Sequence, residues 1–138
     1  MTQPHDPRVP ESGVERPAAG TVLVIEDEPQ VRRVTSMMLR RMGFDVLEAA
    51  TADEATGHIE SRGLEIDLIV SDVVMPGVRG PSLVERLRAR APRAGILFVS
   101  GYPEPSAPDA AILARHHFLP KPFTPDDLAR AVRRALAG

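Results

Sequence analysis

The chain has 138 residues, of which 43% are hydrophobic, enough for one domain with a buried core. Its formal net charge of -2 at pH 7 gives no reason to expect nucleic acid or a membrane surface as a partner. The absence of cysteine excludes disulfides, thiolate metal sites and cysteine nucleophiles, and it is compatible with the cytoplasm. No apolar run approaches the roughly 18 residues of a membrane span.

The beginning of the chain has the composition of a disordered segment. It carries mixed charges, no apolar stretch and the prolines Pro4, Pro7, Pro10 and Pro17. This is not the pattern of a secretory signal. We therefore expect a disordered tail over residues 1–20 and a single domain over residues 21–138.

The first predicted strand is at residues 21–25, where TVLVI is an apolar run rich in β-branched residues, as in a parallel sheet buried on both faces. A helix then opens at Pro29 and ends at Gly43. Apolar residues at helical spacing predict that this helix buries one stripe, made of Val31, Val34, Met38 and Met42.

Two further strand and helix pairs follow. The second strand is predicted at residues 44–49, and Thr51 with Glu54 forms a capping-box signature for a helix that ends near residue 63. The third strand is predicted at residues 67–71. Pro81 opens a third helix, whose expected inner face consists of Leu83, Val84 and Leu87.

The last part of the chain begins with a fourth strand at residues 95–99. Prolines at 103, 105 and 108 prevent a long helix from starting early, so we expect a short helix at residues 109–115. A fifth strand is predicted at residues 117–119. Thr124 caps a final helix with Pro125 at its first position, and we expect it to bury Leu128, Val132 and Leu136.

Strands alternate with helices five times, which predicts a doubly wound parallel sheet with helices on both faces. Such sheets bind ligands at the carboxyl ends of their strands. The polar residues that follow the strands here are Glu26, Asp27, Asp72, Ser100 and Lys121. The first and third strands are neighbours in this architecture, so three carboxylates meet and repel one another. A hard divalent cation relieves this repulsion, and oxygen ligands suit Mg²⁺.

Each of these residues also has a simpler interpretation. An acid after a strand can be a solvated turn residue, and Asp27 can cap the first helix. Taken alone, Ser100 is an ordinary loop serine and Lys121 an exposed lysine. However, prolines on both sides of Lys121 fix the backbone there, and the following bond is a candidate for the cis form. The whole set favours a cation site suited to phosphoryl chemistry.

Four segments carry a family resemblance: VLVIEDE at 22–28, DLIVSDVVMPG at 67–77, LFVSGYP at 97–103 and FLPKPF at 118–123. In this order and spacing the chain resembles the receiver domain of two-component response regulators over essentially everything after residue 20. The sequences SGY at 100–102 and FLPKPF at 118–123 are most similar to receivers of hybrid sensor histidine kinases and related stand-alone receivers. The resemblance implies a flavodoxin-like (βα)5 fold with strand order 2-1-3-4-5.

The resemblance also implies a role for each site residue. Asp72 aligns with the phospho-acceptor, and Glu26, Asp27, Asp72 and the Val74 carbonyl align with the ligands of Mg²⁺, for which Mn²⁺ can substitute. Contact with the phosphoryl oxygens is implied for Lys121 and Ser100, a switch for Ser100 and Phe118, and control of the phosphoryl lifetime for Val74 and Tyr102. Two departures stand out: Glu26, where many members have Asp, and the proline-rich stretch before the fourth helix.

We therefore expect a single-domain response regulator that accepts a phosphoryl group from a sensor histidine kinase or histidine phosphotransfer protein and presents a switched surface to a downstream protein. The resemblance implies a cytoplasmic phospho-acceptor, not a turnover enzyme, that is a monomer or a weak phosphorylation-dependent dimer. No output domain precedes Gly138, so we expect signalling through protein contacts at the fifth strand and helix and at the first helix, whose outer face carries Arg32, Arg33, Arg40 and Arg41. The alternatives are a receiver excised from a hybrid histidine kinase and, less favoured, a binding scaffold that is independent of phosphorylation.

Two other classes of protein fit the sequence less well. Hydrolases with an aspartyl-phosphate intermediate place the nucleophile after the first strand and a second acid two residues later, whereas Glu26 and Asp27 are adjacent. A flavin-binding protein needs a phosphate loop rich in Ser, Thr or Gly after the first strand, where this chain has three acids.

Overall fold

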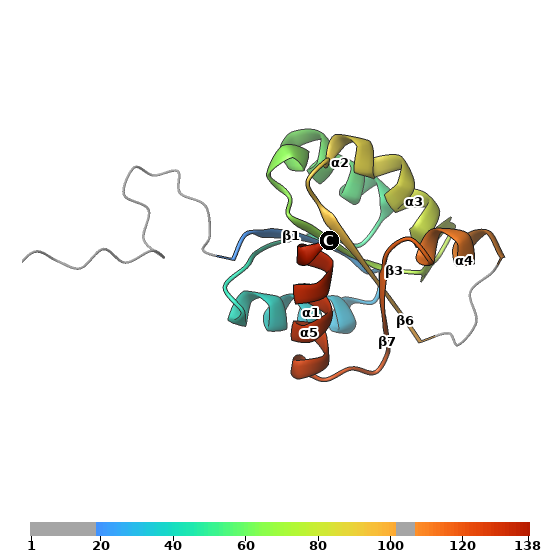
Figure 1. The fold of residues 1–138 in the computed structure, drawn as a ribbon. Helices are drawn as coiled ribbons and strands as arrows, with labels where there is room; N and C mark the ends of the chain where they lie inside the picture. Colours follow the sequence, from blue (N-terminus) through green and yellow to red (C-terminus); the bar gives the residue numbers. More distant parts are fainter. Residues whose placement is uncertain (1–18, 102–106) are drawn as a thin grey trace, which may run out of the picture.

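The computed structural model describes residues 19–101 and 107–138 of the chain (Figure 1). A five-stranded parallel sheet has the order β2-β1-β3-β6-β7. Its strands are β1 (Thr21–Ile25), β2 (Asp45–Ala49), β3 (Leu68–Asp72), β6 (Gly95–Ser100) and β7 (His117–Pro120). The strands β6 and β7 are the fourth and fifth of the sheet, so the predicted flavodoxin-like order 2-1-3-4-5 is confirmed.

Helices cover both faces of this sheet (Figure 1). They are α1 (Pro29–Arg41), α2 (Ala52–Arg62), α3 (Gly80–Leu87), α4 (Ala107–Leu113) and α5 (Pro125–Ala137), with short 3-10 turns η1 (Gly63–Glu65) and η2 (Arg88–Arg90). A small antiparallel hairpin of β4 (Val74–Met75) and β5 (Val78–Arg79) follows β3. This hairpin lies where we expected only a loop.

Alternate residues of β1 serve two cores, because successive side chains of a strand point to opposite faces. Leu23 and Ile25 belong to a core with Ile59 of α2 and Leu83 of α3. Val22 and Val24 belong to a second core, with Leu39 of α1 and Leu128 of α5. The strand is buried on both sides, which explains its continuous apolar sequence.

The predicted stripe of α1 is wrong in part. The helix buries Thr35, Ser36 and Leu39, whereas Val34 is 48% exposed. Met38 and Met42 are only partly buried against the core. The small side chains of Thr35 and Ser36 lie on the inner face of the helix, which a count of apolar residues does not detect.

The inner face of α5 differs from the prediction in a similar way. Leu128 and Val132 are buried as expected, but Leu136 is 41% exposed and Ala135 is buried in its place. At this end α5 packs close to the sheet: a Cβ added to Gly95 would lie 2.3 Å from the carbonyl oxygen of Ala135. Only small residues fit such an approach.

The helix starts follow the predicted caps in two cases. The Thr51 hydroxyl accepts a hydrogen bond from the Glu54 amide at 3.1 Å, and Thr124 forms a capping box with Asp127. Asp27 does not cap α1, because the cap position is Glu28, which makes no side-chain capping bond. The fourth helix starts and ends two residues before the range we predicted, 109–115.

Two predictions fall on residues that the structure does not describe. Most of the expected tail over residues 1–20 lies outside the described residues, as does Tyr102. Within residues 19–101 and 107–138, no helix combines the length and hydropathy needed to cross a membrane.

Candidate functional site

Three carboxylates meet at the carboxyl ends of β1 and β3. These strands are direct neighbours, with Ile25 opposite Ser71, so the residues that follow them come side by side. One carboxylate oxygen each from Glu26, Asp27 and Asp72 lies within 4.8 Å of the others. Glu26 is 3% exposed and Asp72 is 7% exposed, so water screens their repulsion poorly.

Lys121 reaches these acids from the end of β7. Its amide donates a hydrogen bond to the Ser100 carbonyl at 2.9 Å, and its bond to Pro122 is cis. The Lys121 ammonium lies 2.7 Å from Glu26 Oε1 and 3.4 Å from Asp72 Oδ2. Burial lowers the pKa of Lys121, but its hydrogen bond to Glu26 and the charge of Asp72 outweigh this effect, so the pKa is raised overall. The lysine therefore remains a cation between two acids.

Backbone donors fix the two buried acids. The Glu28 amide donates to Glu26 Oε2 at 3.2 Å, and the Val74 amide lies 3.4 Å from Asp72 Oδ1. Arg32, which we expected on the outer face of α1, donates from Nη1 to the Glu26 carbonyl at 2.9 Å. The two amide contacts hold the carboxylates toward the strand ends, whereas the Arg32 bond fixes the backbone of Glu26.

Gly80, which follows the β4–β5 hairpin, packs directly against the backbone of Asp72. Sequence reasoning did not assign it to the site. The Gly80 amide donates to the Val73 carbonyl at 2.9 Å. A Cβ on Gly80 would lie 1.8 Å from the carbonyl oxygen of Asp72, so any other residue would clash with the backbone. Its place between Arg79 and Pro81, eight residues after Asp72, was the available sequence signal.

The remaining described residues of the predicted site are Ser100, Val74 and Phe118. Ser100 ends β6 and is buried, one residue beyond the partner of Asp72 in the sheet register. Val74 starts the hairpin directly after the acceptor strand. Phe118 pairs with Phe98 across the strands, and its side chain is 39% exposed. The structure thus brings Glu26, Asp27, Asp72 and Lys121 into one cluster, with Ser100 and Val74 at its rim.

The donor set fits a hard divalent cation. Three carboxylates offer oxygen ligands within a short span, which is the chemistry that Mg²⁺ prefers. One lysine offsets only part of their negative charge. A hollow of about 460 Å³ opens beside Asp27, lined also by Thr51, Met75 and Gly77, so the Asp27 member of the cluster faces the surface.

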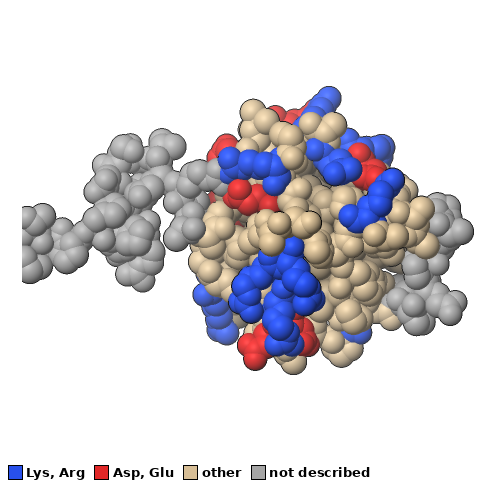
Figure 2. All heavy atoms as spheres, in the orientation of Figure 1, with Lys and Arg blue, Asp and Glu red and all other residues tan. Residues whose placement is uncertain are grey.

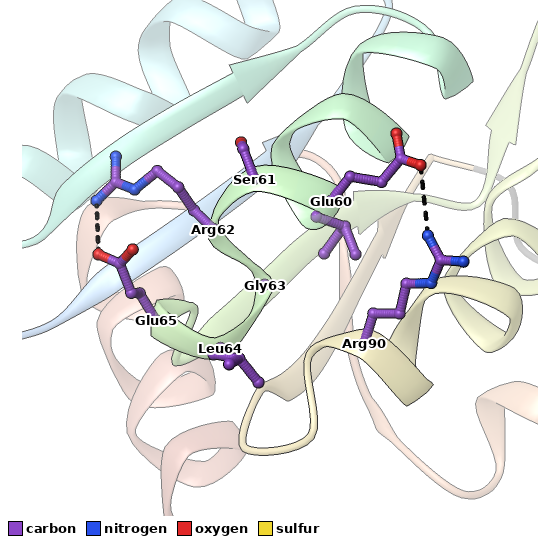
Figure 3. A pocket seen from close by; sticks show the side chains of 8 residues that line it. Glu60, Ser61, Arg62, Gly63, Leu64, Glu65 and Arg90 are labelled. Carbon is purple, nitrogen blue, oxygen red and sulfur yellow. Dashed lines mark hydrogen bonds and ion pairs between the residues drawn. The ribbon is translucent and has the colours of Figure 1, made fainter.

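Another hollow, of about 750 Å³, lies beside η1, before β3 begins, and so at the opposite edge of the sheet (Figure 3). Its charged side chains point toward one another in pairs: Glu60 with Arg90 at 3.4 Å and Arg62 with Glu65 at 3.5 Å. Because these groups already satisfy one another, this hollow lacks the concentration of like charge found at the strand ends.

Comparison with known proteins agrees with this geometry. The family model of the response regulator receiver domain matches residues 22–133. The sensor kinase CckA of Brucella abortus is 41% identical over 127 residues, which cover 91% of this chain and 13% of the kinase. The transcriptional regulatory protein FixJ of Bradyrhizobium diazoefficiens is 33% identical over 119 residues, which cover 85% of this chain and 57% of that protein.

Solved structures show the same likeness. The receiver domain of the hybrid histidine kinase CckA has a TM-score of 0.72 at 39% identity, covering 85% of this chain and 99% of the other. The chemotaxis protein CheY4 of Vibrio cholerae has a TM-score of 0.74 at 28% identity, covering 85% and 98%. The chain thus matches whole receiver structures, but only part of its curated relatives. With its parallel sheet and acidic strand ends, the chain belongs to the response regulator receiver domain family of two-component signalling.

Proposed function

We propose that Asp72 accepts a phosphoryl group from a phosphohistidine on a histidine kinase or a histidine phosphotransfer protein. The observation that carries this proposal is the cluster itself: Asp72 is a buried carboxylate with Lys121 Nζ at 3.4 Å and two further acids beside it. No other group of three potential ligand residues within such a short span occurs in the part of the chain that the structure describes.

The residues of the chain have separate tasks in this transfer. Glu26, Asp27, Asp72 and the Val74 carbonyl would hold Mg²⁺, or Mn²⁺ in its place. When bound, the cation offsets the charge that the acids and the phosphoryl oxygens bring together. An Asp72 oxygen forms the new bond to phosphorus as the bond to the donor's imidazole nitrogen breaks, and the electron pair leaves with the imidazole. Lys121 offsets charge on the phosphoryl oxygens.

The phosphorylated state would then be read at the surface. The Ser100 hydroxyl would move toward the phosphoryl oxygens, and Phe118 would turn inward from its half-exposed position. Val74 and Tyr102 would set the lifetime of the acyl phosphate before water hydrolyses it. In this proposal the chain is a cytoplasmic switch for a downstream protein, as a monomer or a weak phosphorylation-dependent dimer, and it turns over no external substrate.

A groove next to Lys121 suits the docking of the donor. It has a volume of about 350 Å³ and is lined by Val31, Val34 and Met38 of α1 together with Pro122 and Phe123. It is mostly apolar, although it lies beside the charged cluster. The exposed side chain of Val34 thus lines an apolar groove beside Lys121, which contacts Asp72, so a donor protein bound in this groove would be close to the acceptor.

The arginines of α1 contribute less to this surface than expected. Arg32 and Arg40 both pair with Glu48 of β2, at 3.3 Å and 3.2 Å. Arg33 and Arg41 remain exposed. We therefore propose that apolar contact by α1 dominates recognition of the donor, and that Val34→Glu lowers transfer from a phosphorylated histidine donor but leaves phosphorylation by acetyl phosphate unchanged.

The central test uses acetyl phosphate as the phosphoryl donor. With Mg²⁺ the protein should gain the mass of one phosphoryl group, and Asp72→Asn should gain none. Asp53→Asn is the matched control, because Asp53 is an exposed acid that lines the hollow beside Asp27 but lies outside the cluster. A phosphoryl gain that persists in Asp72→Asn would refute Asp72 as the acceptor. Absence of the gain from the wild type with every phosphodonor would refute the proposal and favour a binding scaffold.

A further inference from the structure

Asp109 is a buried acid that the proposed phosphoryl transfer does not use. Among the described residues, the buried carboxylates are Glu26, Asp72 and Asp109. The first two belong to the strand-end cluster, but Asp109 lies in the first turn of α4 and is 1% exposed. Its partner is Arg79, the last residue of β5. Arg79 Nε donates to Asp109 Oδ2 at 2.9 Å, and Arg79 Nη2 donates to the same oxygen.

This ion pair ties α4 to the β4–β5 hairpin. The helix has only seven residues. Ala110 and Ala111 are exposed, and Ile112 and Leu113 are only partly buried against the core. Asp109 is thus the one fully buried side chain among residues 109–113 of this helix. A charge-assisted bond from a forked guanidinium fixes both distance and orientation.

Arg79, the other member of the ion pair, is connected to the acidic cluster through the β4–β5 hairpin. Arg79 is the register partner of Val74 in the hairpin. The Val74 amide lies 3.4 Å from Asp72 Oδ1. The next residue, Gly80, packs against the Asp72 backbone and donates to the Val73 carbonyl at 2.9 Å. A shift of Asp72 or Val74 therefore moves the backbone from which the Arg79 side chain extends.

We propose that the Arg79–Asp109 pair is a latch that holds α4 in its resting position and couples it to the acidic cluster. The coupling part rests on the proposed function, because the ligand that moves the hairpin is the cation or the phosphoryl group. Arg79 is about half exposed, so water can solvate its guanidinium when the latch opens. Coupling is reciprocal: if the cation favours one arrangement of α4, cutting the latch also changes the response to the cation.

Hydrogen exchange of the full chain, read by mass spectrometry, tests the latch directly. Arg79→Gln removes the guanidinium at a half-exposed position. Arg86→Gln is the matched control, because Arg86 is an exposed arginine of α3 with no ion pair among the described residues. Without divalent cations, we expect amides of residues 111–114 to exchange at least tenfold faster in Arg79→Gln than in the control, while β1 amides are unchanged. Asp109→Asn should show the same acceleration. Equal exchange in the variant and the control would overturn the latch.

Adding Mg²⁺ separates the coupling from simple structural support. In the wild type, Mg²⁺ should change the exchange of both the β4–β5 hairpin and α4. In Arg79→Gln, the hairpin should still respond while α4 does not. An α4 response that survives in Arg79→Gln would overturn the coupling. If Mg²⁺ changes nothing in the wild type, the proposed metal site fails, whereas faster exchange of α4 in Arg79→Gln would still support the latch.

Discussion

Replacing Asp72 by Asn removes one of three carboxylates that repel one another, and it should stabilise the protein when no divalent cation is present. At the outer limit of 4.8 Å, with an effective dielectric constant of about 20, each like-charge pair costs about 3.5 kcal/mol. Asp72 takes part in two such pairs. Its attraction to Lys121 across 3.4 Å contributes about 5 kcal/mol on the same scale. The two repulsions exceed the attraction by about 2 kcal/mol.

Burial strengthens this expectation. Asp72 is 7% exposed, so its ionised form also carries a desolvation cost that an amide largely avoids. We expect the free energy of unfolding of Asp72→Asn to exceed that of the wild type by about 2 kcal/mol or more in EDTA. Added Mg²⁺ should stabilise the wild type more than the variant, because the variant loses a charged ligand.

Urea denaturation followed by circular dichroism measures both effects, with Asp53→Asn as the control outside the cluster. The control should lose about 0.3 to 1 kcal/mol of stability in EDTA, because Asp53 lies in the first turn of α2 and interacts favourably with the helix dipole, but it should respond to Mg²⁺ as the wild type does. An Asp72→Asn variant that is less stable than the wild type in EDTA would refute the argument from repulsion. Equal stabilisation of the wild type and Asp72→Asn by Mg²⁺ would show that Asp72 is not a ligand.

Three further predictions follow from the packing and the shifted pKa values. Gly80→Ala should lower the free energy of unfolding by about 3 kcal/mol or more, because its Cβ would lie 1.8 Å from the Asp72 carbonyl oxygen. The control Gly57→Ala, whose Cβ would have no neighbour within 4 Å, should raise the free energy of unfolding by about 0.5 to 1 kcal/mol. Similar urea midpoints for the two variants would contradict this prediction. The pKa of Lys121 is raised, so its contribution to stability is complete below the ordinary value of 10.5 and is lost as pH rises through the folded-state value. The stability of the wild type should therefore fall more steeply above pH 10.5 than that of Lys121→Met. Parallel curves of stability against pH would show that the ion pairs of Lys121 with Glu26 and Asp72 do not stabilise the folded state. Burial and then the charge of Arg88 lower the pKa of His116 below 6.5, so its contribution to stability is complete above pH 6.5 and is lost as the pH falls through the folded-state value. His116→Gln should therefore lose less stability than the wild type on acidification below pH 6.5, and an equal loss in both proteins would count against burial of the neutral ring.

The sheet and the cluster were predictable because both depend on local patterns. Short apolar runs mark the strands, and a polar residue at the end of each run falls at the same edge of a parallel sheet. Glu26, Asp27, Asp72 and Lys121 thus follow from chain order alone, and the structure brings them together.

Features that depend on fit between elements were not predictable in this way. The choice of Ala135 over Leu136 for the inner face of α5 depends on how closely the helix approaches Gly95. The pairing of Arg79 with Asp109 joins residues 30 apart, and nothing in the local pattern of either residue identifies the other. The surface of α1 also differs from the prediction, because two of its four arginines form ion pairs with Glu48.

The distribution of charge on the surface was also not predictable from the composition of the chain. Figure 2 shows basic side chains gathered over α5, where Arg130, Arg133 and Arg134 are exposed. The net charge of -2 gives no indication of this gathering. Arg130 pairs with Asp127 at 2.8 Å, three residues earlier on the same helix, so part of this charge is already balanced.

Locating the phosphoryl group within the chain tests the central claim most directly. The protein is incubated with acetyl phosphate and Mg²⁺, treated with borohydride to reduce the acyl phosphate to an alcohol, digested and sequenced by mass spectrometry. The account predicts conversion of Asp72, and of no other acid, to homoserine. Reduction at Glu26 or Asp27 instead, or an acid-stable phosphoryl group on a hydroxyl side chain, would contradict it.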